Sequence, residues 1–151
     1  MNAAAADPHD LQRFVDAQAP VIAAVQAELD AGAKTSHWMW FVFPQLAALG
    51  RSSTAKHYGL SGADAARAYL AHPLLGARLV DCSARVLRAA ARGRSALQIF
   101  GSIDALKLRS CMTLFEAAAP TAQPVFAQVI DALYGGERDA LTQSLLAGDA
   151  R

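Results

Sequence analysis

The segment from Lys34 to Gln45 constrains the fold most, because it carries both tryptophans and two of the six phenylalanines of the chain. Each large ring buries roughly 150 to 250 Å² when a protein folds. So many rings cannot stay in water, and the segment must lie in the core or line a pocket. A continuous apolar run fits either a buried strand or a buried helix. We favour a helical or irregular buried turn that ends at Pro44.

Length and composition predict one globular domain. The chain has 151 residues, of which 54% are hydrophobic and only 18% are charged, which is too much apolar surface for a disordered protein. A chain of this length buries roughly 68 to 70% of its unfolded surface around one core. We expect the domain to span residues 10–147, with a loosely ordered N-terminal stretch at 1–9 and a C-terminal tail at 148–151.

The net charge of +1 makes nucleic acid an unfavoured partner, because no overall field attracts a polyanion. No apolar run approaches the roughly 20 residues that span a bilayer, and the N-terminus lacks a basic region followed by an apolar one. We therefore expect a cytoplasmic protein, monomeric or weakly dimeric, that is not bound to a membrane. Cys82 and Cys111 match no zinc spacing, so we expect reduced core cysteines, no metal site and no cofactor.

Apolar residues at helical spacing, with proline and glycine at the segment ends, predict an all-α compact orthogonal domain of roughly seven to nine helices without a sheet. We expect more than about 60% of the chain to be helical. Ser61 and Asp64 resemble a capping box, and His72 must leave helical geometry because it precedes proline. Helices are expected at 10–18, 20–31, 61–70, 73–92, 97–100, 102–118, 124–134 and 139–146.

Four blocks of the sequence resemble one known family. They are SHWMWFVFPQ at 36–45, YLAHPLLGARL at 69–79, IFG at 99–101 and DALKLRSCMTLF at 104–115. In the order and spacing of these blocks, the chain resembles the family catalogued as domain of unknown function 1810, from Asp10 to Leu146. The resemblance implies a compact all-α fold of mostly bacterial proteins and no established activity. Some members are labelled calpastatin, but calpastatins are long disordered inhibitors, whereas this chain is short and apolar, so we set that label aside.

Lys107 is the polar residue that departs most clearly from the apolar pattern of its helix. At 100° per residue, it shares one side of its helix with Ile103, Ser110 and Leu114, and other apolar residues cover another side, so little of the helix is left for water. An ammonium in such an arc needs a partner or must lose its proton. It is either a cation aimed at an anionic ligand or the partner of Asp104 in an internal ion pair.

His37 and His72 are the candidate acid/base residues, because each adjoins a break in the chain pattern and imidazole transfers protons near neutral pH. The alternative is that His37 bonds a backbone carbonyl and His72 caps the following helix. Arg78 lies at the edge of an apolar stripe and is a candidate anion clamp, whereas Arg85 and its basic neighbours on that helix form a solvated face that pairs with Asp81.

Lys34, Trp38 and Gln45 complete the candidate ligand-binding set. Lys34, with the hydroxyls that follow it, could hold a phosphate or simply be a solvated lysine beside a helix cap. Trp38 could stack on a ligand, although a tryptophan in a buried run also fits the core, and the Gln45 amide needs partners if it is buried. The run from Gly50 to Lys56 lacks the phosphate-loop spacing, and we predict a capped loop there.

These residues favour a protein that binds an anionic small molecule, with nucleotide-like ligands among the candidates, beside the aromatic segment. Lys34, His37, His72, Arg78 and Lys107 would then converge on one concave site. The alternative is a non-catalytic protein-protein interaction module with an exposed apolar patch. Whether the protein is an enzyme, and which reaction it would catalyse, stays open.

Overall fold

The computed structural model describes residues 6–119 and 123–149, so the expected loose N-terminus and C-terminal tail lie partly outside the described residues. In this part of the chain 69% of the residues are helical and no strand is present, which confirms the all-α prediction. The helices are α1 Gln12–Gln18, α2 Ile22–Ala31, α3 Met39–Val42, the 3₁₀ turn η2 Ala47–Leu49, α4 Ser53–His57, α5 Ala63–Ala71, α6 Leu75–Ala91, α7 Ala96–Ala118, α8 Val125–Tyr134 and α9 Ala140–Asp149.

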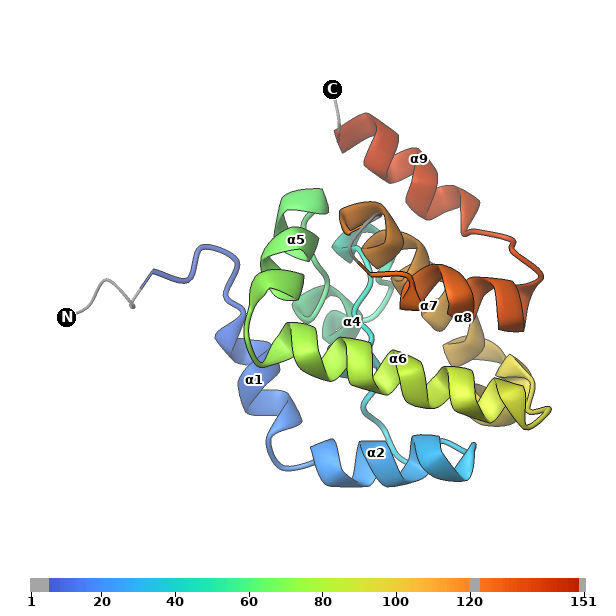
Figure 1. Cartoon of the computed structure of the whole chain (residues 1–151). Coiled ribbons are helices and arrows are strands. Elements are labelled where there is room, and N and C mark those ends of the chain that lie inside the picture. The colour runs from blue at the N-terminus through green and yellow to red at the C-terminus, as the bar shows by residue number, and fades with distance from the viewer. Residues whose placement is uncertain (1–5, 120–122, 150–151) are drawn as a thin grey trace.

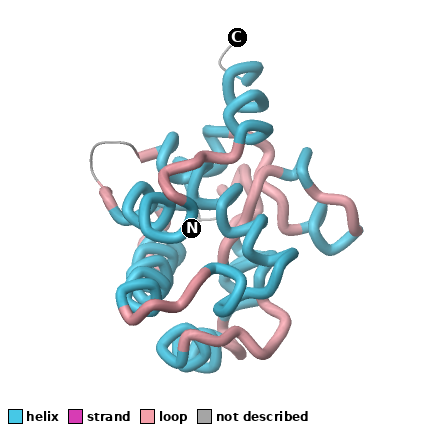
Figure 2. The backbone as a smooth tube through the Cα atoms, turned by 90° about the vertical axis from the view of Figure 1, so that its right-hand side faces the viewer, coloured by secondary structure: helices cyan, strands magenta, loops and turns pink. Residues whose placement is uncertain are grey.

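Helix α6 contacts helices on two sides. It packs between α2 on one side and α8 on the other, and α7 packs against α5, α8 and α9 (Figure 1). The predicted apolar stripe of α6 is fully buried. Helix α9 lies at the outside of the bundle in both views (Figure 2).

Helix ends follow local chemistry in most places. Gly32 ends α2 with φ 71° and Gly135 ends α8 with φ 60°, in the left-handed region that favours glycine. The expected capping box at Ser61 is wrong, because Gly62, which has no side chain, occupies the N-cap position of α5. A capping box does start α7, where the Ser95 hydroxyl accepts from the Gln98 backbone and the Gln98 amide oxygen accepts from the Ser95 backbone.

Helix α7 is broken at Gly101, as the sequence predicts. Gly101 has φ 81° and ψ 170°, so the residues after it form a separate helical segment with its own direction. Its first exposed turn carries Asp104 and Lys107, and the break therefore decides which way these two side chains face.

The aromatic segment forms the short helix α3 and an irregular turn. Trp38 is 1% exposed and its ring lies 6.1 Å from that of Phe43, which in turn meets Phe100 at 6.0 Å. This ring series packs the segment against the first part of α7. Trp40, two residues further on, is only half-buried. The segment is therefore part core and part surface.

The two cysteines are free and buried, as expected. Burial raises the pKa of the Cys82 thiol to about 12, so at neutral pH it remains protonated and unreactive. No helix in the described part of the chain is long and apolar enough to cross a membrane.

Trp38→Ala should lower the free energy of unfolding by about 3 to 5 kcal/mol, because it empties a fully buried aromatic site. Trp40→Ala should cost about 1 to 2 kcal/mol, since the Trp40 ring is half-exposed. Urea unfolding of both variants measures this difference. Equal losses from the two substitutions, or a loss below about 1 kcal/mol for Trp38→Ala, would contradict the burial described here.

Candidate functional site

Asp104 joins two lysines beside the aromatic segment. Its Oδ2 lies 2.9 Å from Lys34 Nζ, and its Oδ1 lies 3.9 Å from Lys107 Nζ. The Lys34 side chain is only 8% exposed, against 25% for Lys107. The carboxylate is therefore committed mainly to the buried Lys34, and the charge of Lys107 is less closely compensated. The alternative of a solvated Lys34 is wrong, and its ammonium is engaged by Asp104 within the protein.

Each lysine also lies over a tryptophan ring. Lys34 Nζ is 5.0 Å from the centre of the Trp38 ring, and Lys107 Nζ is 5.4 Å from the centre of the Trp40 ring. Both distances are in the range of a cation–π contact. The Trp38 ring is thus covered by protein, while the Trp40 ring backs the more exposed ammonium of Lys107.

The Glu28 carboxylate holds the turn that precedes Trp38. It accepts hydrogen bonds from the Thr35 and Ser36 backbone N–H groups at 2.8 and 3.0 Å, from Ser36 Oγ at 2.6 Å and from Trp38 Nε1 at 3.0 Å. Partial burial alone would raise the pKa of Glu28, but these hydrogen bonds outweigh it and lower the pKa to about 2. Glu28 therefore anchors the turn that joins Lys34 to Trp38.

A cavity of about 410 Å³ opens where α7, α9 and the segment 45–55 meet, and we call it the Lys107 cavity. Its size falls in the range of small-molecule sites. Its lining residues are Gln45, Leu49, Arg51, Ser52, Ala55, Ile103, Leu106, Lys107, Ser110, Asp139 and Leu141. Two of the sequence-predicted site residues, Gln45 and Lys107, therefore share one cavity.

Three donor groups of this lining have weak or no partners within the described chain. Lys107 has only its 3.9 Å contact with Asp104 and its contact with Trp40. Arg51 forms no ion pair there, and the Gln45 side-chain amide forms no hydrogen bond. Two of the three donors are cations, so the cavity offers hydrogen-bond donors to an anion.

The other polar groups of the lining are already engaged. Ser52 caps α4 by accepting from Ala55 N at 3.1 Å, as expected of a capped loop. Ser110 Oγ donates to the Leu106 carbonyl at 3.3 Å. Asp139 Oδ2 accepts from the backbone and hydroxyl of Thr142 at 2.9 and 2.6 Å, which places it at the start of α9. These groups form part of the cavity wall, and their hydrogen bonds are made within the protein.

Exposed aliphatic side chains form the remaining wall. Ile103, Leu106 and Leu141 are 69%, 60% and 58% exposed, and all three line the cavity. The expectation that little of the helix after Ser102 is left for water is wrong for its first two turns. Exposed apolar groups that gather at one cavity indicate a contact surface.

His72 is a helix cap. Its Nδ1 accepts from the backbone N–H groups of Leu74 and Leu75 at 3.1 and 3.2 Å, and its backbone leaves helical geometry at ψ 127° as predicted. His72 lines a different hollow, together with Asp7 and Leu11. His37 is exposed, before α3. Neither imidazole lines the Lys107 cavity.

Arg78 belongs to a buried polar network. Its Nη1 donates to Gln18 Oε1 at 3.3 Å, and Gln18 Nε2 donates to the Phe41 carbonyl at 2.6 Å and to the Tyr69 hydroxyl at 3.0 Å. Gln18 is only 1% exposed. This network ties α1, α3, α5 and α6 together, so Arg78 has a structural partner and does not line the Lys107 cavity.

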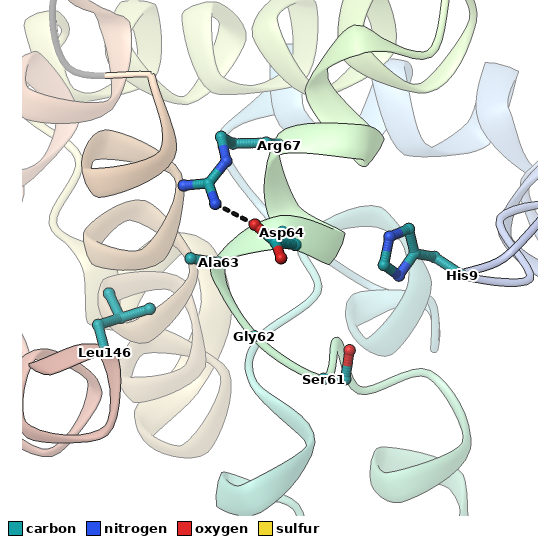
Figure 3. A pocket seen from close by; sticks show the side chains of 7 residues that line it. All are labelled: His9, Ser61, Gly62, Ala63, Asp64, Arg67 and Leu146. Carbon is teal, nitrogen blue, oxygen red and sulfur yellow. Dashed lines mark hydrogen bonds and ion pairs between the residues drawn. The ribbon is translucent and has the colours of Figure 1, made fainter. Parts of the chain in front are cut away.

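A second hollow lies at the start of α5 (Figure 3). Arg67 is the one lysine or arginine among its lining residues in the described chain, and it pairs with Asp64, as the dashed line marks. His9 stands on the opposite wall from Leu146. With its cation already paired, this hollow offers less to an anion than the Lys107 cavity does.

Sequence reasoning identified Gln45 and Lys107 but missed Arg51 and the exposed aliphatic wall. Arg51 stands in a loop that resembles no motif, and only the fold brings that loop to α7. Within the described residues, no group of three or more histidine, cysteine, aspartate or glutamate side chains is placed to hold a metal ion.

The comparisons with known proteins agree with this fold. Residues 8–146 match the family described as Protein of unknown function (DUF1810), and the chain belongs to that family. It is similar to the conserved hypothetical protein Rv1873 from Mycobacterium tuberculosis, whose crystal structure was determined at 1.38 Å. The two share 52% sequence identity with a TM-score of 0.90, over 93% of this chain and 99% of that one. No curated protein matches the chain.

Glu28→Gln should lower the free energy of unfolding at pH 7 by about 1.5 to 3 kcal/mol, because the charged acceptor of four hydrogen bonds is lost. The folded-state pKa of Glu28 is depressed from 4.5 to about 2, so its contribution is present above pH 4.5 and is lost as the pH falls towards 2. The difference in unfolding free energy between the wild type and Glu28→Gln should therefore decrease as the pH falls from 4.5 towards 2. Urea unfolding at several pH values measures this difference.

Glu137→Gln is the matched control for this substitution. Glu137 pairs with Arg109 at the surface, where its side chain is 77% exposed. Its loss should change stability by less than about 1 kcal/mol at every pH. A pH-independent gap for Glu28→Gln would show that the carboxylate is not the anchor of the turn.

Proposed function

We propose that the protein binds a small anionic molecule in the Lys107 cavity. The observation that carries this proposal is the meeting of three weakly engaged donors, from Gln45, Arg51 and Lys107, at one opening of about 410 Å³. Weakly engaged polar groups beside apolar walls are typical of small-molecule sites. The contact of Lys107 Nζ with the Trp40 ring at 5.4 Å supports a site close to the aromatic segment.

We assign no reaction to this site. A general acid or base must come within hydrogen-bond reach of the group it protonates. The candidate histidines, His37 and His72, do not line the Lys107 cavity, and His72 is engaged as a helix cap. The proposal is therefore a binding function, in which Lys107 and Arg51 supply charge and Gln45 supplies an orienting amide.

A second candidate function is recognition of another protein through the same face. The exposure of Ile103, Leu106 and Leu141 favours it, because exposed aliphatic residues that cluster often mark interfaces. The two candidates differ in what they require of Lys107. A small anion needs its charge, whereas an apolar protein contact depends mainly on the aliphatic groups.

Anions that occupy the cavity should raise the melting temperature of the wild type, because a ligand that binds only the native state stabilises it by about 2.7 kcal/mol at a hundredfold excess over its Kd. A thermal-shift panel of carboxylates, phosphorylated metabolites and nucleotides tests this. Lys107→Met should weaken the binding of any hit by about tenfold or more. The variant should remain folded, because the one ion pair that Lys107 forms within the described residues is the long contact of 3.9 Å with Asp104.

Lys56→Met is the matched control, since it removes the same charge from an exposed position in α4 that does not line the cavity. It should leave the Kd unchanged. Hits that bind equally well to both variants, or a panel without any hit, would contradict the proposal. Self-association that Leu106→Asp abolishes, in the absence of any hit, would favour the interaction candidate.

A further inference from the structure

We infer that the ligand of the Lys107 cavity is a small aliphatic carboxylate, an anion of single charge with a hydrocarbon tail, rather than a nucleotide. This inference rests on the proposed function and specifies its ligand class. It depends on three properties of the cavity: its charge, the absence of rings in its described lining, and the position of its aliphatic side chains.

The charge of the lining suits a single negative charge. Arg51 and Lys107 contribute two positive charges and Asp139 contributes one negative charge, which leaves a balance of one positive charge. Asp139 is fixed in place by Thr142 at the start of α9. A doubly charged phosphate would exceed this balance of one positive charge, whereas a singly charged carboxylate matches it.

The described lining contains no aromatic residue on which a base could stack. Base stacking on a ring contributes about 1 to 3 kcal/mol in nucleotide-binding sites. The Trp40 ring, whose centre lies 5.4 Å from Lys107 Nζ, does not line the cavity. A nucleotide would therefore gain neither a stacking partner nor a match in charge.

The aliphatic residues are placed to cover a hydrocarbon chain. Ile103, Leu106, Lys107 and Ser110 follow the spacing i, i+3, i+4 and i+7, so they share one face of α7, and Leu141 of α9 lines the same cavity. These aliphatic side chains are 58 to 69% exposed without a ligand. A chain bound along this face would remove apolar surface from water while its carboxylate stayed beside Lys107.

Isothermal titration with octanoate, acetate, 1-octanol and adenosine monophosphate tests separately whether binding requires a negative charge and whether it requires a hydrocarbon chain. Octanoate should bind, and acetate and 1-octanol should each bind at least about tenfold more weakly, since one lacks the hydrocarbon and the other the charge. Hexanoate should have a Kd about threefold to tenfold above that of octanoate, because a buried methylene contributes up to about fourfold. Adenosine monophosphate should not compete.

Leu106→Asp and Leu97→Asp form a matched pair of variants. Both leucines are in α7 and similarly exposed, at 60% and 63%, but only Leu106 lines the cavity. Leu106→Asp should raise the Kd for octanoate about tenfold or more, and Leu97→Asp should leave it within about twofold. Lys107→Met should also raise it about tenfold. Thermal melts of the unliganded variants verify that each is folded.

The outcomes distinguish this inference from the proposed function. Binding of adenosine monophosphate that depends on Lys107, without binding of octanoate, would overturn the aliphatic assignment and leave the anion site in place. Octanoate binding that is unchanged in Lys107→Met would also overturn it, because the hydrocarbon alone would then be recognised. If no anion of any class binds in a Lys107-dependent way, the proposed function itself fails.

Discussion

The ion pair between Lys34 and Asp104 is the contact on which the site depends. It joins a loop near the N-terminus to the second segment of α7, and the Lys34 side chain is almost fully buried. A buried charge is tolerated only when it is paired, and removing one partner of such a pair typically costs about 3 to 5 kcal/mol. Because Asp104 is held by Lys34 at 2.9 Å, its contact with Lys107 is long, at 3.9 Å. The Lys34–Asp104 ion pair thereby leaves the Lys107 ammonium available to a ligand.

The aromatic segment serves the core and the site together. Trp38 is buried against Phe43 and donates its indole N–H to Glu28, whereas Trp40 is half-buried behind Lys107. Trp38 immediately precedes α3 and Trp40 lies within it. Their rings therefore lie in different environments. Fixing the first ring in the core also positions the second ring, which lies 5.4 Å from Lys107 Nζ.

The polar residues of the chain divide into those that the fold satisfies and those that it leaves available. His72 is engaged by the backbone at the start of α6, and Arg78 by the Gln18 amide. Gln45 and Lys107 have no comparable partner in the described structure. The described part of the chain therefore contains a region, the Lys107 cavity, in which donors and apolar groups have weak internal partners or none.

The sequence by itself determined the all-α fold, most helix ends and the break at Gly101, because helical periodicity and the conformational limits of glycine and proline act over a few residues. It also placed Gln45 and Lys107 among the site candidates. Only the tertiary structure decided that Lys34 pairs with Asp104, that Arg51 faces the same cavity as Lys107 and that the aliphatic wall there is exposed. These contacts join residues far apart in the chain, and helix phase alone does not show which face of a helix its neighbours will cover.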